Sequence, residues 1–183
     1  MVKVLALSGV CTAYAALFAT VAVAWRAGPV PPGPAKTLAA FAPVAFVTAA
    51  CVALLYVFLF NQSAAAFGEH ARKRREAKDR GDKAPQLAEV KYGNSVAVLA
   101  ANRCAGNYLE QLLPFLLSLY GHALFVSASR AAMFGWAWVF FRSYYGLAFS
   151  RPFPALLAST MPAYCCVWWM AGTAVHAAAA LVP

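Results

Sequence analysis

Five apolar runs, each about as long as a membrane is thick, dominate this 183-residue sequence. An α-helix rises ~1.5 Å per residue, so roughly 20 mostly apolar residues cross a hydrocarbon core of ~30 Å. Charged residues make up only 11% of the chain, which excludes an ordinary soluble domain. The sequence therefore predicts an all-α integral membrane protein with four or five crossings, at Val4–Trp25, Leu38–Phe60, Val96–Ser127, Ala131–Phe149 and Phe153–Val182.

The first apolar run allows two interpretations. Residues 1–27 have the length of a membrane-spanning helix, and we expect a retained one, because the run is longer than the core of a signal peptide. The alternative is a cleaved targeting segment, since a basic start precedes the run and Ala22–Ala24 has the small-residue pattern of a cleavage site. A Pro/Gly-rich linker follows at 28–37, and residues 38–183 form the predicted four-helix unit.

A charged loop is predicted between two of the runs, at residues 61–91. It carries eight of the fifteen Lys and Arg residues and five of the six acidic ones, which predicts a solvated, partly helical connector beside anionic headgroups. A specific ligand site is the alternative interpretation. The basic residues do not form the patch of a nucleic-acid-binding fold, so no nucleic-acid partner is expected. If all five runs cross, ten basic residues flank one side and three the other, which makes the loop side cytoplasmic or its organellar equivalent, in the endoplasmic reticulum or another organelle.

Three polar residues stand within the third run, in the stretch "NRCAGNYLEQLLPF". On a helix that turns ~100° per residue, Asn107 and Glu110 lie at about +40° and −20° from Arg103, so the three share one face. Glu110 is the one carboxylate outside residues 69–89. A polar stripe of this kind is expected to face protein or a cavity, and the glutamate is expected to have a cationic or hydrogen-bonding partner, such as Arg103, Arg142 or the ammonium group of a ligand.

A second polar group is expected to lie beside this stripe. Arg142 and Tyr145 come late in the fourth run, which returns toward the charged-loop side, near the level where Arg103 enters. Arginine suits carboxylates and glutamate suits an ammonium group, so these residues would hold a zwitterionic molecule with several carboxylates. Salt bridges that only fix helix packing are the alternative. The histidines and cysteines have no metal-ligand spacing, so no metal site is predicted.

The pattern Arg103-x-x-x-Asn107-x-x-Glu110-x-x-x-Pro114-Phe115 resembles the signature of the family of membrane-associated proteins in eicosanoid and glutathione metabolism (MAPEG), in particular its microsomal glutathione transferase and prostaglandin E synthase branch. The resemblance implies a four-helix membrane bundle, here with an additional amino-terminal helix, that assembles as a homotrimer. It also implies glutathione as the cofactor, bound by Arg103, Asn107 and Glu110 and, by a looser match, by Arg142 and Tyr145.

The resemblance implies less about the chemistry. Relatives of the eicosanoid branch carry an arginine near the start of the last helix that stabilises the thiolate, whereas this sequence has Arg151 earlier and Ser159 as the nearest hydroxyl. Arg142, Arg151 and Ser159 are therefore weak catalytic candidates.

The leading hypothesis is a transferase or peroxidase that activates the glutathione thiolate against lipophilic electrophiles from the membrane lipid. The alternatives are a non-catalytic relative that binds lipid or is an accessory subunit of a membrane complex and, less favoured, a transporter.

Overall fold

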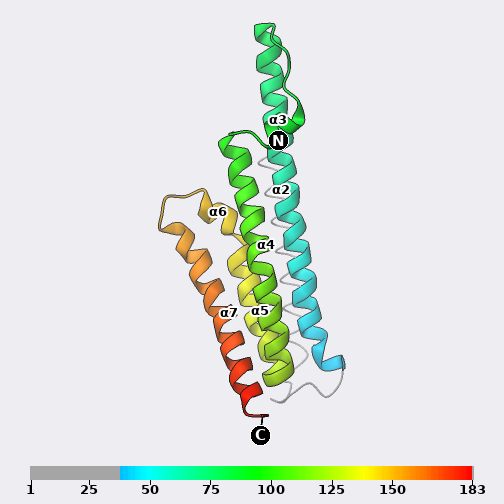
Figure 1. Ribbon diagram of the computed structural model, residues 1–183, viewed down its shortest axis with the longest axis vertical. Coiled ribbons are helices and arrows are strands. Elements are labelled where there is room, and N and C mark those ends of the chain that lie inside the picture. Colours follow the sequence, from blue (N-terminus) through cyan, green and yellow to red (C-terminus); the bar gives the residue numbers. More distant parts are fainter. Residues whose placement is uncertain (1–37, 183) are drawn as a thin grey trace.

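Four long helices form a bundle in the computed structural model, which describes residues 38–182 (Figure 1). The predicted first span, Val4–Trp25, and the whole of the predicted linker, residues 28–37, lie outside the described residues. The described part is helical and contains no strand, which confirms the all-α prediction. The long helices are α2 (Ala42–Arg80), α4 (Val96–His122), α5 (Ala128–Ser143) and α7 (Ala155–Ala179), and the short ones are η1 (Leu38–Phe41), α3 (Leu87–Lys91), η2 (Ala123–Ser127) and α6 (Tyr145–Phe149).

Two helical stretches of the described chain are long and apolar enough to cross a membrane. They are Leu38–Arg80 and Val96–Ser143, the second of which comprises α4, η2 and α5. Only 28% and 39% of their most apolar segments is buried inside the bundle, whereas a core helix of a soluble protein is mostly buried. Large apolar side chains on the outer surface of the bundle, such as Phe60, Leu113 and Trp168, therefore suit a lipid environment.

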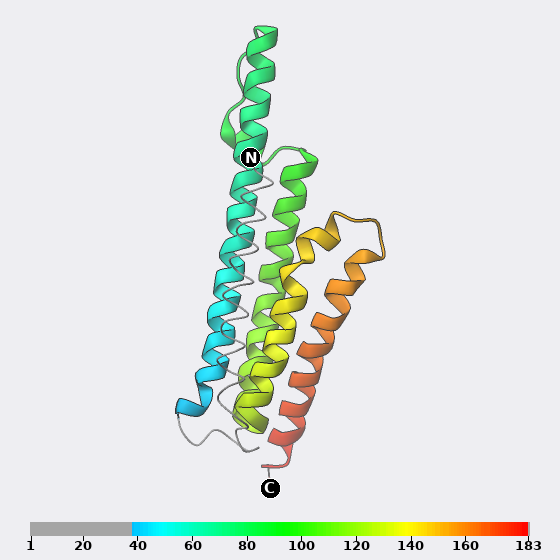
Figure 2. The same cartoon turned by 180° about the vertical axis from the view of Figure 1, so that it is seen from behind.

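Helix α2 extends well beyond the run that was predicted to cross the membrane. The sequence predicted a span ending at Phe60 and a connector from Asn61, but the helix continues to Arg80 and ends at Gly81, whose φ of 75° is left-handed. At ~1.5 Å per residue, the 39 residues of α2 measure roughly 58 Å, nearly twice the hydrocarbon thickness. The predicted connector is thus partly helical, as expected: most of its helical part is a projection of α2 (Figure 2), and α3 forms the rest.

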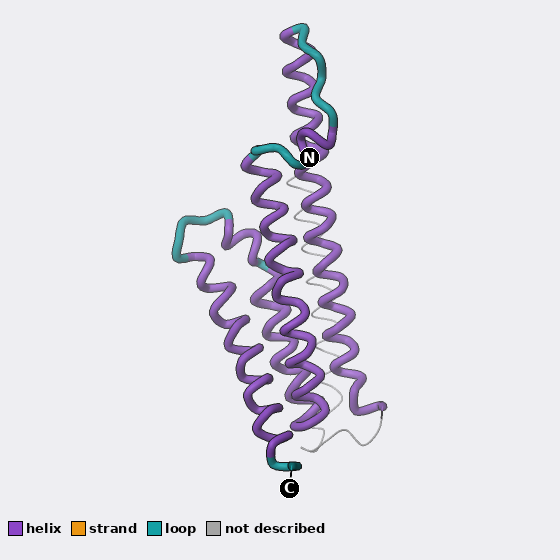
Figure 3. The backbone as a smooth tube through the Cα atoms, in the orientation of Figure 1, coloured by secondary structure: helices purple, strands orange, loops and turns teal. Residues whose placement is uncertain are grey.

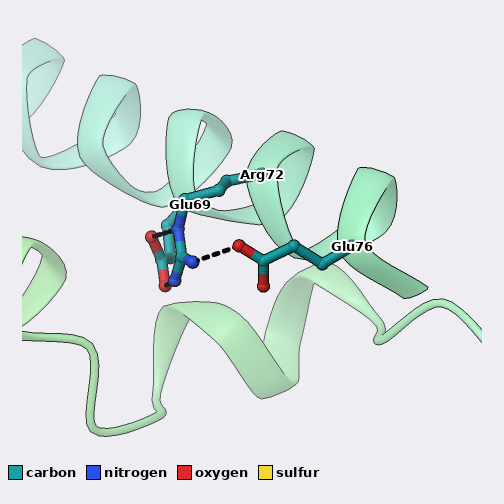
Figure 4. Close-up of polar contacts among 3 residues, drawn as sticks. All are labelled: Glu69, Arg72 and Glu76. Carbon is teal, nitrogen blue, oxygen red and sulfur yellow. Dashed lines mark hydrogen bonds and ion pairs between the residues drawn. The ribbon is translucent and has the colours of Figure 1, made fainter. Parts of the chain in front are cut away.

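Exposed ion pairs run along this projection. Arg72 lies between two glutamates one turn away on either side: its Nε and Nη2 bond Glu69 at 2.9 and 2.6 Å, and its Nη1 bonds Glu76 (Figure 4). Pairs at these spacings support a solvated helix. Hydrogen bonding from Arg72 lowers the pKa of the Glu69 carboxyl below its ordinary value.

The fourth predicted run, Ala131–Phe149, is divided into two helices. After η2 the backbone is extended at Ser127, so that α4 and α5 form an antiparallel hairpin (Figure 3). Helix α5 ends at Ser143, and Tyr144 separates it from α6. The prediction of one continuous helix was therefore wrong at Tyr144, because apolarity alone does not reveal a local break in the backbone.

Tight contacts join the helices in the core. The Tyr108 hydroxyl of α4 donates a hydrogen bond of 2.8 Å to the Cys51 carbonyl of α2, and the Phe115 and Trp138 rings stack with centroids 3.9 Å apart. At Gly135 of α5, an added Cβ would lie 2.7 Å from Cγ1 of Val47. Helices α2 and α5 therefore approach each other at a glycine, and the packed α4–α5 pair holds the polar groups described next.

Candidate functional site

Arg142 is the most buried charge of the described chain, with no exposed surface. It lies one residue before the end of α5, and its Nη2 donates a hydrogen bond of 2.5 Å to Oδ1 of Asn107 on α4. Asn107 is itself 8% exposed. This Arg142–Asn107 pair places one side of the guanidinium in a fixed orientation between two packed helices.

The other donors of this guanidinium have no partner. Nε and Nη1 of Arg142 are buried and form no hydrogen bond within the described residues. No acidic side chain there forms an ion pair with Arg142 either. An uncompensated buried charge costs several kcal/mol, so an anion or other acceptor at these two atoms would be strongly favoured.

Aromatic rings enclose the guanidinium. The Tyr145 ring lies 4.4 Å from Cζ of Arg142, and the Trp138 ring, one turn earlier on α5, lies 6.0 Å away. Both distances fall within the range of cation–π contacts, which stabilise a cation without neutralising it. The break at Tyr144 lets α6 begin at Tyr145, whose side chain is 3% exposed.

A second charged group lies on the outer side of α4. Arg103 Nη1 and Glu110 Oε1 are 3.5 Å apart, two turns along the same helix, and their side chains are 57% and 56% exposed. The distance is at the limit of a hydrogen bond. This Arg103–Glu110 pair is therefore weakly held in one copy of the chain and is accessible to a ligand or to a neighbouring protein surface.

The predicted polar stripe is thus divided between two environments. Asn107 points into the bundle toward Arg142, whereas Arg103 and Glu110 point outward. The helical angles placed all three residues on one face of α4. That face lies at the border between the buried and the exposed side of the helix, so Asn107 is covered by protein and Arg103 and Glu110 are not. The prediction that Arg103 and Glu110 are covered by protein is not met within a single copy of the chain.

The weak catalytic candidates lie in different surroundings. Arg151 is exposed in the connection between α6 and α7. Ser159 is fully buried, and its Oγ donates a hydrogen bond of 2.7 Å to the Phe141 carbonyl, next to Arg142 in the chain. The proton of the Ser159 hydroxyl is therefore engaged by the backbone, and Arg151 is not held against the buried arginine by any described contact.

One polar contact near the site was not expected from the sequence. Gln62 of α2 donates a hydrogen bond of 2.8 Å from Nε2 to Oδ1 of Asn102, directly before Arg103. Gln62 was assigned to a connector, and Asn102 lies about 100° from Arg103 on the helix. The polar stretch from Asn102 to Glu110 was the signal in the sequence for a polar contact here. The partner could not be predicted, because Gln62 lies beyond the predicted end of its helix at Phe60.

Together these residues offer two separated cationic groups and one carboxylate. The buried cation at Arg142 suits a carboxylate, and the Arg103–Glu110 pair suits a carboxylate and an ammonium group. Of residues 38–182, no group of three or more His, Cys, Asp and Glu side chains could hold a metal ion. The arrangement is suited to binding a small zwitterion with more than one carboxylate.

Comparison with known proteins gives one match. The model of the MAPEG family matches residues 44–181, well over half of the chain. The matched segment contains α4 to α7 and almost all of α2. No curated protein and no solved structure matches the chain.

Proposed function

The chain belongs to the MAPEG family of membrane proteins, and from this premise we propose that it binds glutathione and activates its thiol. The observation that carries the proposal is the buried Arg142, held by Asn107 and with two donors unfilled. Glutathione has two carboxylates and one ammonium group. One carboxylate fills the open donors of Arg142, and the Arg103–Glu110 pair binds the remaining charged groups.

The exposed position of Arg103 and Glu110 supports a site shared between copies of the chain. Two charged side chains on the outer surface of an apolar bundle are unfavourable against lipid. A neighbouring copy in a homotrimer covers them and leaves an aqueous route from the side of the α2 projection. The zwitterion then enters from water, whereas an apolar second substrate arrives through the membrane.

The proposed chemistry is attack by the glutathione thiolate on a lipophilic electrophile. A nearby cation favours the thiolate over the thiol, because it stabilises the charged form. The thiolate sulfur then forms a bond to the electrophilic carbon while the bond from that carbon to its leaving group breaks. With a peroxide it instead attacks the O–O bond and releases an alcohol, and a second glutathione converts the resulting sulfenic acid to glutathione disulfide and water.

A second candidate function is glutathione or lipid binding without catalysis, and one observation favours it. Helix α7 contains no Lys or Arg, Arg151 precedes it in an exposed connection, and the Ser159 hydroxyl is engaged by the Phe141 carbonyl. Helix α7 therefore supplies neither a Lys or Arg side chain nor a free Ser159 hydroxyl to stabilise a thiolate. Conjugation of a chromogenic electrophile by the purified protein distinguishes the two, since only an enzyme accelerates it.

Calorimetric titration of the purified full chain with glutathione tests the binding proposal. We expect saturable binding that weakens by roughly tenfold in Arg103→Ala and in Glu110→Ala, because each removes one charge-assisted contact. Arg130→Ala is the matched control, since Arg130 is exposed and lies at the opposite end of α5 from Arg142. If both site variants bind glutathione as tightly as the unmodified chain does, Arg103 and Glu110 are not glutathione contacts.

A further inference from the structure

The projection of α2 carries a second polar concavity, separate from the site above. A hollow of about 630 Å³ is lined by His70, Ala71, Arg74, Arg75, Lys78, Asp82 and Ala84. The chain turns at Gly81 and runs back along α2, as the loop above α3 in Figure 3 shows, so that Asp82 and Ala84 supply the second wall. His70 Nε2 lies 3.1 Å from the Pro85 carbonyl and joins the returning segment to α2.

The charges around this helix are sorted by face. Taking ~100° per residue from His70, the lining cations Arg74, Lys78 and Arg75 lie at about +40°, +80° and +140°. Glu69, Arg72 and Glu76 lie between about −100° and −160° and neutralise one another. The two ion pairs of Arg72 therefore lie away from the hollow.

The cations of the hollow have no such partners. Arg74, Arg75 and Lys78 form no ion pair within the described residues. Asp82 is the one carboxylate of the lining, and its Oδ2 is 3.2 Å from Nε of Arg80. Three uncompensated cations thus face one concavity, and such a group attracts anions and binds phosphate oxygens well.

Distance from the membrane indicates the kind of anion. Arg74 lies fourteen residues after Phe60, the last residue of the apolar run, which is roughly 21 Å along the helix. The headgroup layer adds only about 5–8 Å on each side of the hydrocarbon. A helix α2 that crosses near the membrane normal would carry the hollow into water above the lipid headgroups.

Distance also separates the hollow from the Arg142 site. Gln62 contacts Asn102, next to Arg103, so it marks the level of that site on α2. Arg74 lies twelve residues further, or roughly 18 Å along the axis. One small molecule in the hollow does not reach Arg142.

We propose that this hollow binds a small soluble anion with two or more phosphate groups. Its volume is in the range of small-molecule sites, ~300–1,000 Å³. Arg74 and Arg75 supply planar forks for phosphate oxygens, and Lys78 supplies a point charge one turn later. Bound ligand bridges α2 and the returning segment.

Calorimetric titration of the full chain in phosphatidylcholine nanodiscs with tripolyphosphate tests the proposal. We expect binding that weakens about tenfold in Arg74→Gln and in Lys78→Gln, since each removes one charge-assisted contact. Arg72→Gln makes the same change in net charge on the opposite face of the helix and should change the affinity less than about twofold. Circular dichroism checks that each variant is folded.

Three results would overturn the proposal. The first is that the unmodified chain does not bind tripolyphosphate, and the second is that Arg72→Gln lowers the affinity for tripolyphosphate as much as Arg74→Gln does. The third is that phosphatidylinositol bisphosphate in the nanodisc competes with tripolyphosphate and that Arg74→Gln abolishes this competition. The last result would assign the hollow to a lipid headgroup. Glutathione should not displace tripolyphosphate, so this test and the test of the Arg142 site can fail independently.

Discussion

Arg142 Nη2 donates to Asn107 Oδ1 at 2.5 Å, so a buried charge on α5 is oriented by a neutral amide on α4. Asn107→Asp would place a carboxylate of the protein itself beside Arg142 and neutralise the charge of its guanidinium. We expect the thermal midpoint in detergent to stay the same or rise, whereas glutathione affinity falls roughly tenfold, because the ligand carboxylate loses its electrostatic partner.

Asn107→Ala provides the comparison for this prediction. It leaves a further donor of Arg142 without a partner and should lower the free energy of unfolding by about 1–3 kcal/mol. If Arg142 only fixed helix packing, Asn107→Asp would stabilise the chain and leave glutathione binding unaltered. That result would separate a structural arginine from a ligand-binding one.

Gly135→Ala should destabilise the bundle by about 1–3 kcal/mol, because the new methyl group would overlap with Val47 and lie 3.0 Å from Cδ1 of Leu119. Gly172→Ala is the matched control, since a Cβ there meets nothing within 4 Å. Chemical unfolding in mixed micelles measures both variants. Equal midpoints would contradict the close approach of α2 and α5.

Ser159→Ala should lower stability by about 1 kcal/mol through loss of the bond to the Phe141 carbonyl. If the chain conjugates glutathione to an electrophile, we expect the kcat of this variant to remain within about twofold, because the hydroxyl proton is already engaged by the backbone. A fall in kcat on the order of 100-fold, the scale of a lost acid or base, would instead place Ser159 in the chemistry.

Glu69 should titrate below the ordinary range of a glutamate, because Arg72 hydrogen-bonds its ionised form. A lowered pKa in the folded state means that the contribution of Glu69 to stability is present above the ordinary pKa and is lost as the pH falls through the lowered one. Carboxyl carbon NMR shifts measured against pH follow this group. In Arg72→Gln its midpoint should move upward, and an unmoved midpoint would show that the pair does not persist in solution.

The apolar runs predicted the four long helices of the described bundle, because roughly 20 mostly apolar residues in a row indicate a helix that can cross hydrocarbon. They did not predict where helices end. Gln62 to Arg80 is polar and yet helical, since Ala, Glu, Lys and Arg favour helix and Arg72 pairs at one-turn spacing. Apolarity therefore locates the exit of α2 from the membrane and not its last residue.

The candidate site could be predicted in part for a similar reason. Helical angles placed Asn107 near Arg103 and Glu110, but they did not show that Asn107 turns inward to Arg142. That contact depends on how α4 and α5 pack against each other, and the spacing of residues along one helix does not reveal this packing. The open donors of Arg142 likewise follow from the positions of all its neighbours and not from a local motif.

A structure of the assembled protein with bound glutathione, determined by electron cryomicroscopy, tests the central claim most directly. The account predicts a glutathione carboxylate within about 3 Å of both Nε and Nη1 of Arg142, with Arg103 and Glu110 against the rest of the tripeptide. Glutathione bound elsewhere, with those two donors filled by groups of the protein itself, would contradict it.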